Sequence, residues 1–315
     1  MENSRRTFLK KGLAGALTLG VASLPKSLTA LPTEMNVPCA KRVVLISLDG
    51  ICVDGYLKAK TPHLDALMGE GALSLDTRVV MPSVTLPNWT SHLTGSGPEQ
   101  HGVVDNGWEI GKFTLPAIET DSEGYYPSVF KVLKDAIPTM KTAFYYNWIN
   151  LFYPYNKQYL DEVSYLEQDA YVPNYDKALS FLIANRAHPT LVFLYSVHTD
   201  HAGHKYKWMS PEYIQSIEEA DVEIGKFIDR MKQEGMYEDT YFMFLTDHGG
   251  IEYGHGGVST DEMIVPWGIV GPSIKKGYKI TEANNTVNTA ATILHLFKVK
   301  KPLSWTGEVI KSMFK

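Results

Sequence analysis

The sequence predicts an α/β fold built on a central, mostly parallel sheet with helices on both faces. Five continuous apolar runs, rich in β-branched and aromatic residues, recur along the 315-residue chain. Segments with helical spacing of apolar residues lie between them. Apolar runs without polar alternation are typical of strands buried on both faces of a parallel sheet, and their alternation with helices indicates a layered architecture.

The strands are expected where apolar residues run without interruption. The first run, at residues 41–48, reads KRVVLISL and ends at Asp49-Gly50. The other four expected strands span residues 142–146, 190–197, 240–246 and 263–270. Helices are expected where apolar residues recur at helical spacing, which occurs at residues 62–70, 175–186, 211–234 and 287–297.

Residues 108–173 interrupt this alternation. They contain short elements, scattered prolines and an aromatic cluster, which consists of Phe144, Tyr145, Tyr146, Trp148, Phe152, Tyr153 and Tyr155. We expect this range to be an insertion region over the active face of a single domain, residues 31–315. The cluster either packs in the core and the insertion or stacks on an aromatic part of a substrate, and packing is the favoured interpretation.

The first thirty residues have the composition of an export signal. Arg5-Arg6 precede an apolar run at residues 13–24 and a small-residue end near Ala30, a pattern typical of twin-arginine signals. The apolar run is too short for a stable membrane span. We therefore expect residues 1–30 to be removed, and the remaining chain to be exported to the periplasm without a membrane span.

The charge balance limits the partners of the exported chain. Residues 1–30 hold five of the 30 basic residues and one of the 35 acidic residues, so the remaining chain has a formal charge of −9. This balance argues against binding to a nucleic-acid polymer, whereas a small anionic substrate can still bind where cations dominate the local field. Nothing in the sequence indicates an oligomeric state.

Acidic residues and histidines follow three of the expected strands. Asp49 ends the first strand, Asp200 follows the third, and Asp247-His248 end the fourth. Ligands of open α/β sheets bind beyond the carboxyl ends of the strands, so we expect these side chains to meet in one crevice. Carboxylates placed so close together repel one another unless cations lie between them.

Three histidines complete this constellation. His204 lies four residues after Asp200, His248 follows Asp247, and His255 lies in a glycine-rich segment that can bend round an ion. Mixed imidazole and carboxylate ligands suit catalytic Zn²⁺. A single histidine of this kind is more often structural, but the whole set predicts a metal centre.

The order of these residues resembles a known family. The segments that carry the resemblance are DG at 49–50, TPHLDAL at 61–67, MPSVTLPN at 81–88, LTG at 93–95, HGVVDN at 101–106, DHAGH at 200–204, TDHG at 246–249 and HGG at 255–257. Together they resemble the type I phosphodiesterase/nucleotide pyrophosphatase branch of the alkaline phosphatase superfamily. The resemblance runs from about residue 43 to residue 272 and implies an alkaline phosphatase-like fold.

The resemblance implies a metal-dependent phosphoric ester hydrolase with two divalent ions, expected to be Zn²⁺. The implied ligands are Asp49, Thr85, Asp247 and His248 for one ion, and Asp200, His204 and His255 for the other.

The resemblance also implies the chemical roles. Thr85 would be the nucleophile that forms a phosphothreonine intermediate, and Asn106 would hydrogen-bond a phosphoryl oxygen. A short helix is expected at residues 88–93, with its N–H groups toward the substrate. As a separate hypothesis, Trp108 lies at the edge of the substrate pocket.

Several alternatives stay open. A threonine before a helix is commonly its N-cap, which gives Thr85 a structural interpretation. A phosphate monoesterase would share the metals and the threonine; some such enzymes carry a Lys-x-Arg pair after the asparagine. No such pair occurs between residues 106 and 189, which favours diesters or phosphonates.

The placement of the last histidine is also informative. His255 follows His248 by only seven residues, a spacing that resembles phosphonoacetate hydrolases, and His295, in an apolar helix, is the other candidate ligand. The natural substrate, whether a nucleotide, a phospholipid headgroup or a phosphonate, is left open. A non-catalytic exported binding module is the least favoured interpretation, because all seven ligands are present.

Overall fold

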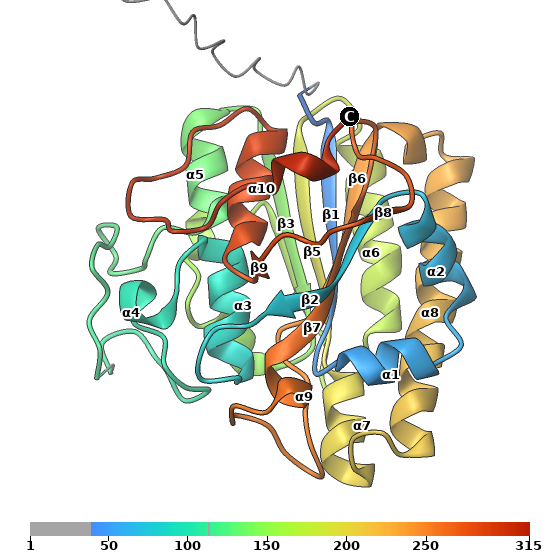
Figure 1. Cartoon of the computed structure of the whole chain (residues 1–315). Helices are drawn as coiled ribbons and strands as arrows, with labels where there is room; N and C mark the ends of the chain where they lie inside the picture. Colours follow the sequence, from blue (N-terminus) through green and yellow to red (C-terminus); the bar gives the residue numbers. More distant parts are fainter. Residues whose placement is uncertain (1–38, 113) are drawn as a thin grey trace, which may run out of the picture. The chain divides into compact units, whose positions relative to one another are not determined.

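The strands form a single nine-stranded sheet in the order β4-β3-β5-β1-β6-β7-β2-β8, with β9 paired to β2. The computed structural model describes residues 39–112 and 114–315, which fall in one compact unit, Val37–Lys315. The expected export signal at residues 1–30 lies outside the described residues. Figure 1 shows the sheet standing between helices, with the chain coloured from blue to red.

The five strands from β4 to β6 are all parallel to one another. β7 runs antiparallel to both β6 and β2, and β8 and β9 pair with β2 in parallel. The expectation of a mostly parallel sheet is therefore confirmed. The strands are β1 (Arg42–Leu48), β2 (Ala72–Arg78), β3 (Lys141–Tyr146), β4 (Glu162–Tyr165), β5 (Thr190–Ser196), β6 (Thr240–Leu245), β7 (Ile264–Val270), β8 (Tyr278–Lys279) and β9 (Asn284–Asn285).

The five strands expected from apolar runs all form, with ends shifted by a residue at most. β1, β5 and β6 are buried at every position, as uninterrupted apolar runs require. β2 and β4 were not expected. β2 alternates buried and partly exposed residues and carries Asp76 and Arg78, and β4 has four residues, so neither forms an apolar run.

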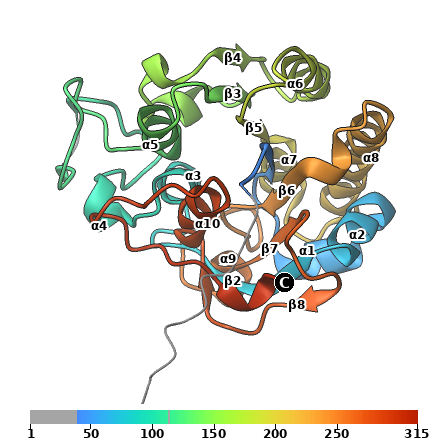
Figure 2. The same cartoon turned by 90° about the horizontal axis from the view of Figure 1, so that it is seen from above.

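Helices cover both faces of the sheet, as the sequence predicts. Seen from above, α3, α5 and α10 lie on one face, and α1, α2, α6 and α8 lie on the other (Figure 2). The principal helices are α1 (Val53–Lys58), α2 (Pro62–Gly69), α3 (Thr85–Thr94), α5 (Val129–Ala136), α6 (Val172–Ala184), α7 (His198–Tyr206), α8 (Pro211–Gln233) and α10 (Asn288–Leu296). The shorter ones are α4 (Pro98–His101) and α9 (Thr260–Met263). Among the described residues, none of the helices is long and apolar enough to cross a bilayer.

Residues 108–173, expected to be an insertion region over the active face, contribute elements to the sheet itself. They include α5, β3 and β4, so part of this range builds one edge of the sheet. Five rings of the aromatic cluster are buried, in agreement with core packing: Phe144, Tyr145, Tyr146, Phe152 and Tyr155. Tyr153 is exposed, and Trp148 is half-buried.

Candidate metal centre

Three neighbouring parallel strands end at the same level and deliver the acidic residues. Leu48 of β1 pairs with Ser196 of β5, and Ser47 pairs with Leu245 of β6. Asp49 directly follows β1, whereas Asp247 lies two residues after β6. α7 begins just after β5 and carries Asp200 one turn before His204. The structure therefore brings the carboxylates together at the carboxyl edge of the sheet, as expected.

Close approach of the chain at this edge depends on Gly50. Its φ is +72°, in the left-handed region that favours glycine. A Cβ atom at this position would lie 3.0 Å from the Cα and Cβ atoms of Asp200. The turn after β1 can therefore pass directly beside the first turn of α7.

The first group of ligands surrounds the imidazole of His248. Its Nδ1 donates to the carbonyl oxygen of Gly249 at 2.8 Å, which leaves Nε2 as the unprotonated nitrogen. Nε2 lies 3.1 Å from Thr85 Oγ1, 3.4 Å from Asp49 Oδ1 and 3.3 Å from Asp247 Oδ2. Both carboxylate oxygens are buried without a hydrogen-bond partner. Buried, unpaired acceptors around one nitrogen fit a cation.

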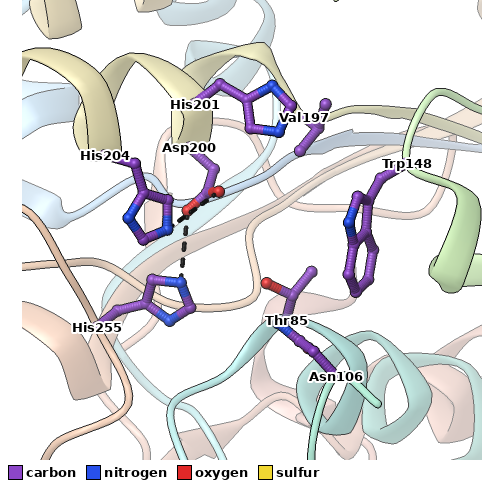
Figure 3. Close-up of a pocket in the computed structure, with 8 residues that line it drawn as sticks. All are labelled: Thr85, Asn106, Trp148, Val197, Asp200, His201, His204 and His255. Atoms are coloured by element: carbon purple, nitrogen blue, oxygen red, sulfur yellow. Dashed lines mark ion pairs between the residues drawn. The ribbon is translucent and has the colours of Figure 1, made fainter. Parts of the chain in front are cut away.

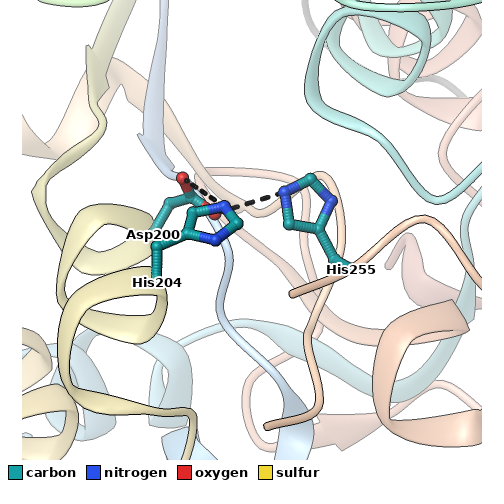
Figure 4. A group of neighbouring side chains, drawn as sticks. All are labelled: Asp200, His204 and His255. Atoms are coloured by element: carbon teal, nitrogen blue, oxygen red, sulfur yellow. Dashed lines mark ion pairs between the residues drawn. The ribbon is translucent and has the colours of Figure 1, made fainter. Parts of the chain in front are cut away.

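The second group consists of Asp200, His204 and His255 (Figure 4). The Nε2 atoms of the two imidazoles lie 3.5 Å and 3.7 Å from the two oxygens of Asp200. Each imidazole donates through Nδ1 to a backbone carbonyl, His204 to Tyr253 at 2.8 Å and His255 to Ser83 at 2.9 Å. Such backbone contacts fix the tautomer and turn Nε2 toward the ion in metal sites.

The two groups are adjacent. The rings of His248 and His255 stack with centroids 3.7 Å apart. Ligand atoms of Asp49, Asp200 and His248 also lie within 4.8 Å of one another, so Asp200 lies between the two groups. The seven residues expected to bind metal therefore form one continuous cluster of oxygen and imidazole donors, which suits divalent transition metals such as Zn²⁺.

Burial and mutual repulsion perturb the carboxylates. Burial, followed by the charge of Asp200, raises the pKa of Asp49 well above its usual range. Burial and the charge of Asp49 do the same to the pKa of Asp247. Burial raises the pKa of Asp200 to about 7. Three carboxyls that resist ionisation side by side are the electrostatic signature expected of a site that a cation would complete.

Thr85 is buried and faces this cluster. Helix α3 begins at Thr85 itself, three residues earlier than the expected helix at 88–93, and its N-cap is Val84. Thr85 is therefore not the N-cap, and its hydroxyl is directed to His248 instead. Asn106 Oδ1 accepts from the backbone nitrogen of Leu86 at 2.8 Å, which holds this side chain beside the start of α3.

A cavity of about 210 Å³ opens above these residues (Figure 3). It is lined by Thr85, Asn106, Trp148, Val197, Asp200, His201, His204 and His255. The indole in its wall belongs to Trp148, whereas Trp108, expected at the pocket edge, is buried and is not part of this lining. Only the membership of Trp148 in the aromatic cluster could have indicated from the sequence that it lines the pocket.

His201 also lines the pocket, although no motif in the sequence predicts this role. Its Nδ1 pairs with Asp169 Oδ1 at 2.6 Å, and its ring is among the side chains that line the cavity (Figure 3). Its position next to Asp200 in the chain was the only signal. The hydrogen bond to Asp169 raises the pKa of His201.

Known proteins share this chain's sequence pattern. A family model described as type I phosphodiesterase / nucleotide pyrophosphatase matches residues 43–290. An uncharacterized pyrophosphatase/phosphodiesterase of Schizosaccharomyces pombe is 28% identical over 232 residues, which cover 66% of this chain and 44% of the relative. Venom phosphodiesterase 2 of Crotalus adamanteus is 27% identical over 224 residues, 66% of this chain and 26% of the relative. The chain thus spans less than half the length of these relatives.

Solved structures share its fold. An inactive variant of murine ectonucleotide pyrophosphatase/phosphodiesterase 5 in complex with AMP aligns with a TM-score of 0.73 and 15% identity, covering 88% of this chain and all of that one. The human counterpart aligns with the same TM-score at 16% identity, covering 87% of this chain. The alkaline phosphatase-like fold that the sequence predicts is therefore confirmed.

Proposed function

The chain belongs to the type I phosphodiesterase/nucleotide pyrophosphatase family, and from this premise we propose that it is a metal-dependent phosphoric ester hydrolase that acts on small phosphodiesters through Thr85. The observation that carries the proposal is the contact of Thr85 Oγ1 with His248 Nε2 at 3.1 Å, beside buried carboxylate oxygens without partners. A hydroxyl in such surroundings can be activated for attack on phosphorus.

Two divalent ions, which we assign as Zn²⁺, are part of the proposal. Asp49, Thr85, Asp247 and His248 would hold one, and Asp200, His204 and His255 the other. When bound, such ions stabilise an ionised hydroxyl and offset the charge on phosphoryl oxygens. The donor set supports this assignment, because every imidazole in it has its Nδ1 hydrogen fixed on a backbone carbonyl, which leaves Nε2 unprotonated and able to ligate.

Thr85 and Asn106 would then act in a two-step displacement at phosphorus. Thr85 Oγ1 gives up its proton to solvent and forms a bond to phosphorus while the bond to the leaving oxygen breaks on the opposite side, and that oxygen takes a proton from solvent. Water then attacks the phosphothreonine, releasing the phosphoryl product and restoring the hydroxyl. Asn106, whose Oδ1 is occupied by Leu86 N, would present its amide nitrogen to a phosphoryl oxygen.

The pocket lining favours a substrate with a single negative charge on phosphorus. None of its eight residues is a lysine or arginine. A phosphate monoester carries a further charge that such a lining would leave unmatched, so we rank the monoesterase below the diesterase. A phosphonate hydrolase remains the alternative that the short spacing from His248 to His255 favours.

The location and the domain boundaries are also proposals. We propose that residues 1–30 direct export to the periplasm and that residues 31–315 form one catalytic domain there. The net negative charge of that part supports small substrates rather than nucleic-acid polymers. A related structure contains AMP, which makes nucleotide esters the first natural substrates to try.

Hydrolysis of bis-p-nitrophenyl phosphate and of p-nitrophenyl phosphate by the zinc-loaded protein tests the proposal. We expect higher kcat/KM on the diester and loss of at least about a thousandfold in Thr85→Ala, since the nucleophile itself is removed. A chelator should abolish the activity, and added zinc should restore it. A clear preference for the monoester, or full activity in Thr85→Ala, would refute the assignment.

A further inference from the structure

The loop that carries His255 is fastened to the segment that carries Thr85. Ser83 is fully buried and lies two residues before Thr85. Its Oγ donates to the carbonyl oxygen of Gly257 at 2.7 Å and accepts from the nitrogen of Gly256 at 3.1 Å. Its own carbonyl oxygen accepts from Nδ1 of His255 at 2.9 Å. One residue therefore contacts three consecutive residues of the loop.

These contacts determine how His255 presents its ligand nitrogen. With Nδ1 donating to Ser83, Nε2 is the unprotonated atom, and it lies 3.7 Å from Asp200 Oδ1. Gly256 has a φ of +113°, and a Cβ there would lie 3.3 Å from a methyl carbon of Val84. The backbone can thus approach the segment before Thr85 closely because residue 256 is a glycine.

Glu262 holds the other end of the same loop. Its carboxylate accepts from Gly257 N at 2.7 Å and from Ser259 Oγ at 2.6 Å. Its carbonyl oxygen accepts from the nitrogen of Gly249, the residue after His248, at 3.0 Å. The loop is therefore braced between Glu262 and Ser83, and Ser83 is the contact that leads to Thr85.

The two ligand groups differ in exposure. The side chains of Asp49, Asp247 and His248 are completely buried. In the second group the side chain of His204 is 43% exposed, and the group opens into the cavity above Thr85. Solvent and chelators can therefore reach the second group more readily than the first.

We propose that Ser83 is a positioning residue that holds the second group, Asp200, His204 and His255, in register with Thr85, and that the ion of this group is the more readily exchanged. The inference rests on the proposed two-metal function. Ser83→Ala would remove both hydroxyl hydrogen bonds and leave Gly256 N and Gly257 O without these partners. His255 would keep its backbone acceptor on residue 83, but the loop that carries it would be held less firmly, whereas the first group makes no contact through this hydroxyl.

Stepwise removal of zinc tests the proposal without relying on activity. The zinc-loaded protein is titrated with a chelator, and the zinc that remains bound is measured by elemental analysis. We expect release from the wild type in two steps. In Ser83→Ala, the more easily removed zinc should leave at a chelator concentration at least about tenfold lower than in the wild type, as expected when a residue that supports a ligand is lost. The chelator concentration that removes the other zinc should stay the same. Ser83→Thr, which keeps the hydroxyl, should restore part of the shift.

Matched variants separate positioning from general destabilisation. Ser96 is also fully buried and shares a hydrogen bond of 2.8 Å with Tyr126, away from both groups, so Ser96→Ala should leave both steps unchanged. Glu262→Gln weakens the opposite brace and should move the easier step alone, which keeps the test valid if Ser83→Ala does not fold. Unchanged steps in both loop variants, or equal shifts of both steps, would overturn the role of Ser83. A wild type that binds no second zinc would instead overturn the two-metal function.

Discussion

At the scale of single residues, Asp49 shows how one carboxylate is prepared for a cation. Its Oδ2 accepts from the hydroxyl of Tyr195 at 2.5 Å and from Nε1 of Trp89 at 3.3 Å. Its Oδ1 has no hydrogen-bond partner and faces His248. Two aromatic donors therefore orient one oxygen, so that the other is turned toward the ligand group. Oxygens arranged in this way need no reorganisation when an ion binds.

Removal of the Tyr195 hydroxyl should weaken metal binding. Tyr195→Phe keeps the buried ring, but it leaves Asp49 with one donor fewer, so we expect the affinity for zinc to fall by about tenfold. The affinity is measured by competition with a chelator. Tyr241→Phe is the matched control, because Tyr241 is equally buried and bonds to Ser273 at 2.8 Å, outside the ligand cluster. Equal affinities in wild type and Tyr195→Phe would show that Trp89 alone suffices.

The residues of the site were predictable to different degrees. Asp49, Asp200, Asp247 and His248 could be identified because each lies at or just after the end of an apolar run, and this position brings them together in a parallel sheet. Thr85 was identified only through the family resemblance. Ser83, Trp148 and His201 could not be identified, because their roles arise from contacts between distant segments. His201 is directed by Asp169, 32 residues away, and nothing local to either residue indicates the pair.

At the scale of elements, the position where each helix or strand begins and ends depends both on the local sequence pattern and on contacts with other segments. Uninterrupted apolar runs located β1, β5 and β6 almost to the residue. β2 was missed because its pattern is that of a half-exposed strand with charged residues. The start of α3 was misplaced by three residues, since Val84 is a poor N-cap by sequence and no side chain caps the helix locally. Local rules identify buried elements better than they identify the ends that contact other segments.

Helix α2 gives an example of capping by another helix. Its N-cap, Thr61, makes no side-chain hydrogen bond to the helix backbone. Asp221, buried on α8, accepts instead from Leu64 N at 2.7 Å and from His63 N at 3.2 Å. The carboxylate thus satisfies two N–H groups at the start of α2 and ties the two helices together.

Loss of this cap should destabilise the fold and leave the site unchanged. Asp221→Ala leaves two N–H groups without partners, so we expect the free energy of unfolding to fall by about 2 kcal/mol. Asp221→Asn, which keeps one acceptor oxygen, should cost about half as much. Urea unfolding measures both. Asp229→Ala on the exposed face of the same helix should change stability by less than about 0.5 kcal/mol. Reduced zinc affinity in folded Asp221→Ala would contradict the assignment of a purely structural role.

At the scale of the whole molecule, the fold concentrates negative charge where three strands end. β1, β5 and β6 are adjacent and parallel, so the residues that follow them cannot avoid one another. The cost of burying three carboxylates is visible in their raised pKa values. In the metal-free chain, protons neutralise these carboxylates, and in the metal-loaded chain, the bound cations neutralise them.

The stabilisation that zinc provides should therefore increase with pH. A raised carboxyl pKa means that the folded, metal-free chain holds a proton that zinc must displace. The bound proton also stabilises the folded, metal-free chain, and this stabilisation is lost as the pH rises through the pKa of the folded state. For Asp200, with a pKa of about 7, the competing proton is mostly bound at pH 6 and mostly absent at pH 8. The pKa values of His248 and His255 are lowered, chiefly by burial, which disfavours protonation of these two ligands.

We expect the zinc affinity to rise by at least about tenfold from pH 6 to pH 8. The reason is that pH 6 lies about one unit below the pKa of Asp200, so zinc must displace its proton there, and one pKa unit corresponds to about 1.4 kcal/mol. The increase in Tm on adding zinc should grow in the same direction, and the difference between metal-loaded and metal-free samples at each pH isolates the effect from other titrating groups. In Asp200→Asn, which has no proton at this position to displace, the part of the pH dependence centred near 7 should disappear. A zinc-induced increase in Tm that is the same at both pH values would mean that these carboxyls are already ionised in the metal-free protein, and that the repulsion among them is relieved in some other way.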